Sequence, residues 1–114
     1  MEVQIFGTKK CKDTQKAERF FKERGIKVHF VDLTQKAVSQ GELNNITRSV
    51  PLDDLIDREG KQFKKRNLEY MVFDTEQELL KDPLLFRTPI VRFSGKATAG
   101  HEPDTWSEWV EQNK

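Results

Sequence analysis

The first part of the chain alternates between strand-like and helix-like spacings of apolar residues. Residues 3–6 form a short β-prone run that ends at Gly7. Apolar positions then recur at helical spacing across residues 12–24, and residues 27–33 alternate as a second strand. A strand, helix and strand of these lengths favour two parallel strands joined by a right-handed crossover.

A mostly helical stretch is predicted next. Ser39 and Glu42 have the spacing of a capping box, in which each side chain satisfies a free amide at the start of a helix. A helix is therefore expected over about 39–49. A second short helix is expected at 52–56, and residues 58–63 resemble its end followed by a polar turn.

The helical stretch is expected to end near residue 82. Thr75 and Glu78 repeat the capping-box spacing, and Pro83 stops the following helix because proline lacks a backbone donor. The same stretch carries the most basic part of the chain, which we interpret as a charged helix end rather than a nucleic-acid contact. Its basic residues are Lys61, Lys64, Lys65 and Arg66.

The last part of the chain is predicted to complete a sheet. Residues 89–93 form a strand, 94–96 a tight turn, and 97–99 a weaker antiparallel partner strand. A final helix is expected after Pro103, with an apolar stripe that packs against the sheet. The stripe consists of Trp106, Trp109 and Val110.

Composition bounds the class of protein. The chain has 114 residues, so one domain over 1–114 is expected. Leu, Ile, Val and Phe make up roughly a quarter of the residues, above the ~20% below which disorder is typical. The 20 Lys and Arg nearly balance the 19 Asp and Glu, for a net charge of +1. This balance gives no broad attraction to nucleic acid or to an anionic membrane.

We expect a cytoplasmic protein without a metal site. No apolar run approaches the ~18 residues of a membrane span, and the opening residues lack the pattern of a signal peptide. The single cysteine, Cys11, cannot form an intramolecular disulfide, and two histidines add too few soft ligands for structural zinc.

Cys11 is the strongest candidate for chemistry. It lies where the first loop becomes a helix, so a thiolate there would face free backbone amides and the positive end of the helix dipole. Lys9, Lys10 and Lys12 add nearby positive charge. A lone cysteine is commonly an inert buried side chain, but this position favours a reactive thiol with a lowered pKa.

Thr14 occupies the place of the second cysteine in a redox dithiol motif, because residues 11–14 have C-x-x-T spacing. A threonine cannot resolve a disulfide. Two roles stay open for its hydroxyl: donation of a hydrogen bond to the thiolate, or an ordinary first-turn bond to the backbone.

The order of several short motifs resembles a known family. The matching pieces are the opening strand, the Cys11 loop, Lys16-Ala17 with the phenylalanines, and residues 41–43, 55–63, 82–85 and 87–91. In this order they resemble the arsenate-reductase-like branch of thioredoxin-fold proteins, and also the related Spx-type regulators and nitrogenase-associated proteins.

The resemblance implies an α/β thioredoxin-like sandwich, with a four-stranded mixed sheet and a helical insertion over about 39–82. It implies that Cys11 attacks an oxyanion held by arginines, and that glutathione and glutaredoxin complete the reduction. It also implies that Thr88-Pro89 is a cis bond that faces Cys11.

The arginine pattern departs from that family. Thr88 stands where the family has an arginine before the strand proline, and Arg87 lies one residue earlier, which reverses side-chain direction in an extended chain. Arg58 is displaced in the same way relative to Gly60. The third arginine has no counterpart around residues 99–101. Arsenate reduction is therefore a weaker expectation.

We expect a small anion or carboxylate site beside Cys11. Arg87 is the best arginine candidate for it, ahead of Arg58 and Arg92; the alternative for each is solvation or pairing with a nearby acid. The remaining candidates are Lys10, Thr14, Thr88 and Pro89.

Two functional hypotheses follow. The leading one is a thiol-dependent oxidoreductase of unknown substrate, with Cys11 as nucleophile and no bound cofactor. Glutathione, another small thiol or glutaredoxin would resolve the adduct, and the substrate would be a small oxyanion or thiol compound. The alternative is a non-enzymatic regulator or adaptor, similar to Spx-type proteins, that binds RNA polymerase or another protein.

Overall fold

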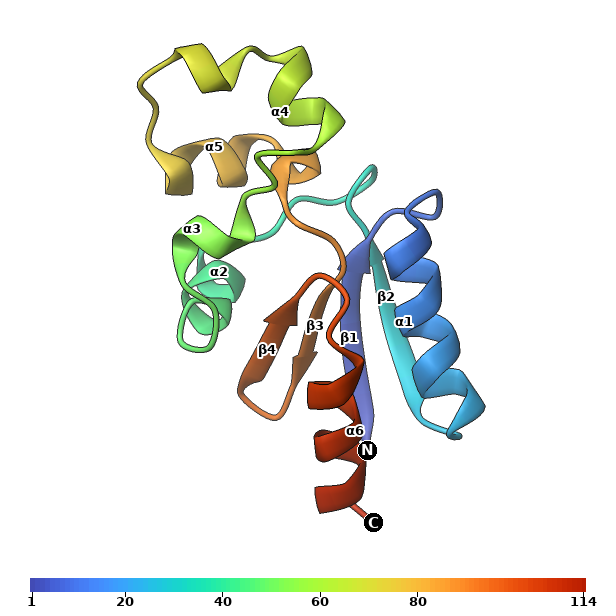
Figure 1. Cartoon of the computed structure of the whole chain (residues 1–114). Coiled ribbons are helices and arrows are strands. Elements are labelled where there is room, and N and C mark those ends of the chain that lie inside the picture. The colour runs from blue at the N-terminus through green and yellow to red at the C-terminus, as the bar shows by residue number, and fades with distance from the viewer.

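The computed structural model describes all 114 residues and has a four-stranded mixed sheet of order β2-β1-β3-β4 (Figure 1). Strand β1 (Glu2–Gly7) is parallel to β2 (Lys27–Asp32). Strand β3 (Ile90–Phe93) is antiparallel to both β1 and β4 (Lys96–Ala99). The predicted strand–helix–strand unit, the C-terminal hairpin and the mixed sheet are all confirmed.

Alternation along the central strand separates two apolar cores. Val3 and Ile5 belong to the core on one face of the sheet, whereas Phe6 belongs to the larger core on the other. Successive strand side chains point to opposite faces, so a single strand supplies both cores. Both faces of β1 therefore carry buried apolar side chains.

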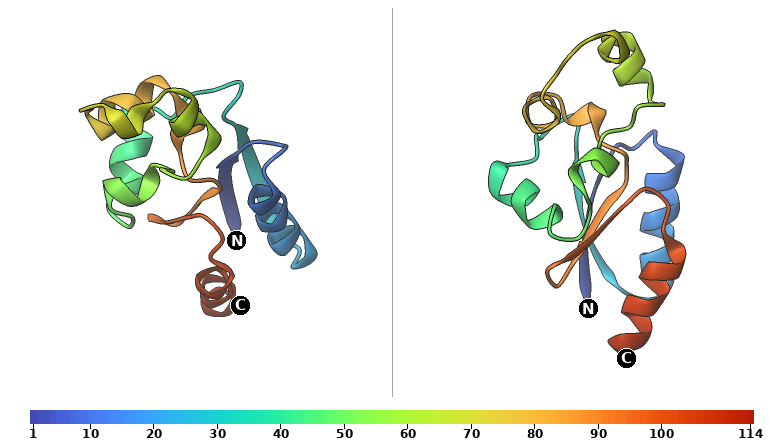
Figure 2. Two further views of the ribbon diagram at one scale, coloured as in Figure 1. Left: turned by 45° about the horizontal axis from the view of Figure 1, so that its top comes forward. Right: turned by 60° about the vertical axis from the view of Figure 1, so that its left-hand side comes forward.

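Helices α1 (Lys12–Glu23) and α6 (Pro103–Gln112) cover the same face of the sheet (Figure 2). Phe21 of α1 packs on Trp106 of α6, with ring centroids 5.6 Å apart. The indole nitrogen of Trp106 donates a 2.8 Å hydrogen bond to the hydroxyl of Thr98 in β4. The predicted burial of the tryptophan stripe is confirmed, with Trp106 and Trp109 only 0% and 4% exposed.

The helical insertion covers the opposite face and rises above one end of the sheet (Figures 1 and 2). Its core joins the insertion to Phe6, Ile90 and Ala97 of the sheet. The elongated shape of the molecule, 46 × 27 × 24 Å, is consistent with this projection. The insertion comprises α2 (Gln40–Ile46), α3 (Leu52–Leu55), α4 (Lys61–Lys65), η1 (Leu68–Tyr70), α5 (Thr75–Lys81) and η2 (Pro83–Leu85).

Three local predictions in the insertion need correction or refinement. The capping box of Ser39 and Glu42 is confirmed, but its helix ends at Ile46 rather than near residue 49. The stretch 58–63, predicted as a helix end and turn, contains the start of α4, because buried Phe63 anchors that turn to the core. The cap of α5 is Asp74, whose carboxylate accepts from the amide of Gln77, and not Thr75.

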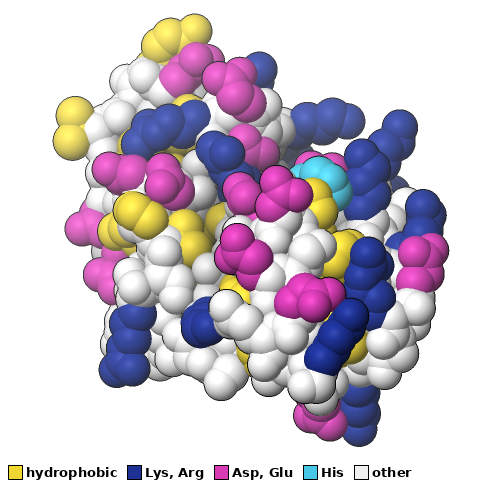
Figure 3. All heavy atoms as spheres, turned by 60° about the horizontal axis from the view of Figure 1, so that its bottom comes forward, with side chains coloured by type: hydrophobic (Ala, Val, Ile, Leu, Met, Phe, Trp, Pro, Cys, Tyr) yellow, Lys and Arg dark blue, Asp and Glu magenta, His cyan; other side chains and the backbone are white.

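The surface carries both signs of charge. On the face drawn in Figure 3, Lys and Arg side chains are interspersed with Asp and Glu. This mixture agrees with the near-zero net charge of the sequence. No helix is long and apolar enough to cross a membrane.

Candidate active site at Cys11

Cys11 lies at the end of the sheet where β1 passes into α1. It is the N-cap of α1, with extended backbone angles of φ −72° and ψ 118°. Its amide donates to the carbonyl of Thr8 at 3.2 Å, and its carbonyl accepts the first helical bond from Gln15 at 3.0 Å. Its side chain does not cap the helix by a hydrogen bond, so the sulfur is free for other contacts while the first amides of α1 stay close.

The hydroxyl of Thr88 donates a hydrogen bond to the sulfur of Cys11 across 3.1 Å. Thr88 lies directly before β3, and strand pairing between β1 and β3 brings the two loops together. The bond between Thr88 and Pro89 is cis, and Pro89 is buried. The structure therefore places the Thr88 hydroxyl at the thiol and contains the cis bond that the family resemblance implied.

Thr14 lies in the first turn of α1 and is fully buried, and its hydroxyl makes no hydrogen bond within the protein. Gly7 explains its tight placement, because a Cβ at Gly7 would collide with the Thr14 hydroxyl. A buried hydroxyl without a partner is costly and rare in proteins. The same hydroxyl contributes to lowering the pKa of Cys11, so we interpret it as a donor to the thiolate rather than to the neutral thiol.

The pKa of the Cys11 thiol lies below its ordinary value. Partial burial opposes this by raising the pKa. The hydroxyls of Thr14 and Thr88 and the backbone amides of Thr14 and Asp13 outweigh burial, because each lies near enough to stabilise the charged sulfur. The direction agrees with the prediction. The contribution of the first helical amides also agrees with the prediction, whereas the two threonine hydroxyls stand in place of the neighbouring lysines.

Lys10 lies in the loop before Cys11 and is exposed. It makes no hydrogen bond to the sulfur, whose side-chain donor is Thr88. It instead borders a polar cavity of about 450 Å³ between this loop and the end of β2. The cavity is lined by Thr8, Lys9, Lys10, Asp32, Thr34 and Gln35.

Arg87 does not join the site, although it is adjacent to Thr88. Its amide donates to the carbonyl of Leu55 at 2.7 Å, and its exposed side chain lies against Gly100. It lines a separate cavity of about 430 Å³ with Asp54 and Glu102. Neighbouring residues in extended chain point in opposite directions, so contact of Thr88 with the sulfur directs Arg87 away.

The other two arginines are also engaged elsewhere. The Arg58 guanidinium lies 5.7 Å and 5.6 Å from the ring centroids of Phe63 and Phe73 inside the insertion. Arg92 donates to the side chains of Gln4 at 2.7 Å and Asn45 at 3.1 Å, which ties β3 to β1 and α2. None of the three arginine candidates makes a hydrogen bond to the thiol.

Sequence reasoning overlooked one residue of the site. Gly7 reads as the end of a strand, yet its missing side chain makes room for Thr14. The available signal was a glycine four residues before the cysteine in an otherwise β-prone run. Glycine within or at the end of a strand often marks a close approach of other atoms.

The chain is similar to known proteins over nearly its whole length. The sequence matches the ArsC family over residues 6–109. This span covers nearly the whole chain. The protein belongs to the ArsC family. A search of curated proteins found no match.

Solved structures share the fold of this ArsC-family chain at low identity. A YFFB protein has a TM-score of 0.81 and 19% identity, covering 93% of this chain and 96% of its own. An arsenate reductase from Vibrio cholerae has a TM-score of 0.75 and 21% identity, covering 95% and 97%. An ArsC-related protein from Brucella melitensis has a TM-score of 0.69 and 24% identity, covering 97% and 96%. These likenesses support the thioredoxin-like fold.

Proposed function

We propose that this ArsC-family protein is a thiol-dependent reductase that uses Cys11 as its nucleophile and an external thiol as its reductant. The observation that carries the proposal is the 3.1 Å hydrogen bond from the Thr88 hydroxyl to the Cys11 sulfur. A thiolate is the nucleophilic form of cysteine, and hydrogen bonds to it increase its population at neutral pH.

The reaction divides into two exchange steps. The Cys11 thiolate attacks one sulfur of an oxidised thiol substrate, the sulfur–sulfur bond breaks, and one thiolate leaves. A second thiolate from outside then attacks the substrate-derived sulfur and releases Cys11 as the thiolate. The chain has one cysteine, so no internal thiol can perform the second step. Glutathione or a glutaredoxin-type protein is the proposed donor.

Arsenate is a less suitable substrate than a small disulfide. A tetrahedral oxyanion is bound best by fixed, paired donors such as arginine forks. Arg58 packs on aromatic rings, and Arg87 lines another cavity. The donors near the sulfur are the Thr14 and Thr88 hydroxyls and two amides, which favour a single charged sulfur over an oxyanion with several charged oxygens.

A reductase panel tests the proposal. Two kinds of substrate are compared: arsenate, and mixed disulfides between glutathione and small thiols. Each is tested with wild type and with Cys11→Ser, and glutathione and glutaredoxin are the reductants. Reduction of the disulfides that requires Cys11, with little arsenate turnover, supports the proposal. Robust turnover at micromolar arsenate would refute the substrate assignment. Absence of any Cys11-dependent activity would favour a regulator or adaptor of the Spx type.

A further inference from the structure

The Thr14 hydroxyl is an unpaired buried donor beside the sulfur of Cys11. Thr14 is 0% exposed, and its hydroxyl makes no hydrogen bond within the protein. Cys11 is the N-cap of α1, and Thr14 is the third helical residue. The side chain of an N-cap residue lies over the third residue of the helix, which is why N-cap oxygens ordinarily accept a hydrogen bond there. The unpaired hydroxyl is therefore next to the sulfur and out of contact with water.

Gly7 confines the hydroxyl from the side of the sheet. A Cβ at Gly7 would collide with both the hydroxyl and the methyl group of Thr14. The backbone at the end of β1 therefore packs directly on this side chain, with no space for a water between them. Of the groups around the hydroxyl, the Cys11 sulfur is the acceptor whose hydrogen-bonding capacity changes during a thiol reaction.

The strength of the sulfur as an acceptor depends on its chemical state. A thiolate carries a full charge, and hydrogen bonds to a charged acceptor are stronger than those to a neutral one. A thiol sulfur and a disulfide sulfur are both uncharged, and uncharged sulfur is a weak acceptor. A buried donor without a partner destabilises the state that contains it. Thr14 consequently stabilises the thiolate of Cys11 relative to both the thiol and the mixed disulfide.

Thr88 provides a comparison within the same site. Its hydroxyl also donates to the sulfur, at 3.1 Å, but the residue is only half-buried. When the sulfur is part of a disulfide, the Thr88 hydroxyl can turn to water, whereas the Thr14 hydroxyl cannot. A hydrogen bond to water is nearly as favourable as one within the protein. Thr14 should therefore destabilise the disulfide more than Thr88 does.

We propose that Thr14 makes Cys11 the preferred leaving group of its mixed disulfide and so selects the sulfur that the incoming thiol attacks. This inference rests on the proposed function, because it concerns the second exchange step. Attack on the substrate-derived sulfur breaks the sulfur–sulfur bond, and the electron pair leaves on Cys11 as a thiolate that Thr14 stabilises. Attack on the Cys11 sulfur would release the substrate thiolate and leave Cys11 in a new disulfide. A more stable leaving thiolate departs faster, so the first reaction is favoured.

The consequence is a short-lived adduct on Cys11. The chain has no second cysteine, so the mixed disulfide persists until an external thiol arrives. An adduct beside an unpaired buried donor is less stable, relative to the free thiolate, than an adduct on an ordinary cysteine. Cys11 is thus suited to repeated turnover rather than to long-term storage of glutathione.

The charged side chains near Cys11 do not make this distinction. None of them hydrogen-bonds to the sulfur. Their field acts equally on every variant of Thr14, so it cancels when the variants are compared. They are Lys9 and Lys10 in the loop, Lys12 and Asp13 in α1, and Arg87 before β3.

The test measures the equilibrium between Cys11 and oxidised glutathione by intact mass, in buffers with fixed ratios of reduced to oxidised glutathione. Thr14→Val keeps the shape of the side chain without the hydroxyl, and Thr14→Ala removes the hydroxyl without adding bulk. Thr14→Ser restores the hydroxyl, and Thr88→Val is the matched control at the half-buried donor. Circular dichroism checks that each variant is folded.

At a pH above the alkylation midpoints of all variants, Thr14→Val and Thr14→Ala should raise the equilibrium constant for adduct formation by about tenfold or more, because they remove a donor that only the thiolate satisfies. Thr14→Ser should stay near wild type, and Thr88→Val should raise the constant by less than Thr14→Val. Equal constants in wild type and Thr14→Val would overturn the inference while leaving the proposed function intact. A larger effect of Thr88→Val would overturn it as well.

The difference between wild type and Thr14→Val should disappear at a pH below the wild-type midpoint. Reduced Cys11 is then a neutral thiol, so the Thr14 hydroxyl is unpaired both before and after adduct formation. A merely structural role of Thr14 would change the constant equally at both pH values, and that result would also overturn the inference.

A second readout follows the attacked sulfur directly. The preformed mixed disulfide of Cys11 with glutathione is mixed with N-acetylcysteine, and the first products are identified by mass after acid quenching. Attack on the glutathione sulfur yields free Cys11, whereas attack on the Cys11 sulfur yields Cys11 that carries acetylcysteine. Wild type should yield mainly free Cys11, and Thr14→Val should shift the products toward the new adduct. An unchanged product ratio would overturn the inference. If folded wild type takes no glutathione at all, the proposed function fails, and the inference fails with it.

Discussion

Thr88 and Cys11 are 77 positions apart in the sequence, yet the Thr88 hydroxyl donates to the Cys11 sulfur across 3.1 Å. The contact exists because β3 pairs with β1, which brings the start of one strand to the end of the other. A hydrogen bond to the charged form of an acid lowers its pKa. This pair therefore links the topology of the sheet directly to the reactivity of the thiol.

The first prediction concerns the pH dependence of alkylation. The thiolate reacts with iodoacetamide and the thiol does not, so the rate should rise with pH to a midpoint below that of an ordinary cysteine. Lowering the pH through this depressed pKa should protonate Cys11 and abolish the reaction. Thr88→Val removes a donor to the thiolate and should move the midpoint upward. A midpoint unchanged in Thr88→Val would show that the hydrogen bond is not functional.

Thr14 provides a second and sharper prediction. Thr14→Val keeps the shape of the side chain and removes a buried hydroxyl that has no complete hydrogen bond. The midpoint of alkylation should rise, whereas stability at acidic pH should be unchanged or slightly higher, because removal of an unsatisfied buried group is not costly. Urea unfolding and alkylation are measured on the same preparation. A clear loss of stability at acidic pH would mean that the hydroxyl has a structural partner instead.

Gly7→Ala should destabilise the fold. The new Cβ would collide with the Thr14 hydroxyl, and overpacking in a core costs about 1–3 kcal/mol. Thermal unfolding should show a drop of roughly 5 °C or more for a domain of this size. Gly41→Ala is the matched control, since a Cβ there meets nothing within 4 Å in helix α2. That control should be neutral or stabilising by about 1 kcal/mol.

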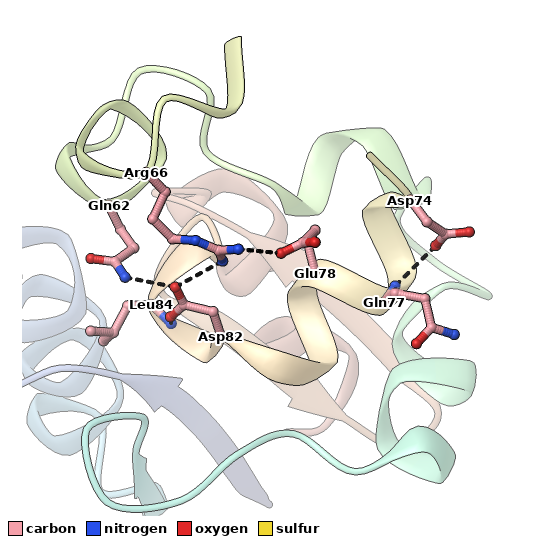
Figure 4. Close-up of polar contacts among 7 residues, drawn as sticks. All are labelled: Gln62, Arg66, Asp74, Gln77, Glu78, Asp82 and Leu84. Carbon is pink, nitrogen blue, oxygen red and sulfur yellow. Dashed lines mark hydrogen bonds and ion pairs between the residues drawn. The ribbon is translucent and has the colours of Figure 1, made fainter. Parts of the chain in front are cut away.

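Arg66 is predicted to be the main electrostatic contributor to the insertion. Its hydrogen bond to Glu78, with support from Asp82 (Figure 4), raises the pKa of the guanidinium, and both acids are largely buried. Arg66→Met leaves two carboxylates without their partner and should cost about 2–3 kcal/mol in urea unfolding. Lys65→Met, on an exposed side chain without an ion pair, should change stability by less than about 0.5 kcal/mol. Equal effects of the two changes would contradict the network.

The sequence predicted the elements that depend on local patterns. Periodicity revealed β1, α1 and the helix that carries Trp106, and the spacing of Ser39 and Glu42 revealed a real capping box. Hydrophobic periodicity did not predict α4. In this short helix one buried residue, Phe63, packs in the core and the other side chains are polar. A single apolar position has no period, so only its tertiary neighbours could define that helix.

Contacts between distant residues were predictable only through the family resemblance. The resemblance implied the cis bond at Thr88-Pro89, which the structure contains. It could not assign directions to the displaced arginines, and the side chain of Arg87, the best candidate among them, lines a separate cavity. Thr88 sets the orientation of Arg87. Because the Thr88 side chain contacts the sulfur, the side chain of the adjacent Arg87 points to the opposite side of the extended chain.

Intact mass after exposure to oxidised glutathione tests the central claim most directly, namely that Cys11 is an accessible and activated nucleophile. The folded protein should gain one adduct of ~305 Da, which follows from condensation of one glutathione with one thiol. Glutaredoxin with glutathione should remove the adduct, and Cys11→Ser should never acquire it. A folded wild type that takes no adduct over hours, while the urea-unfolded chain is modified readily, would contradict the account.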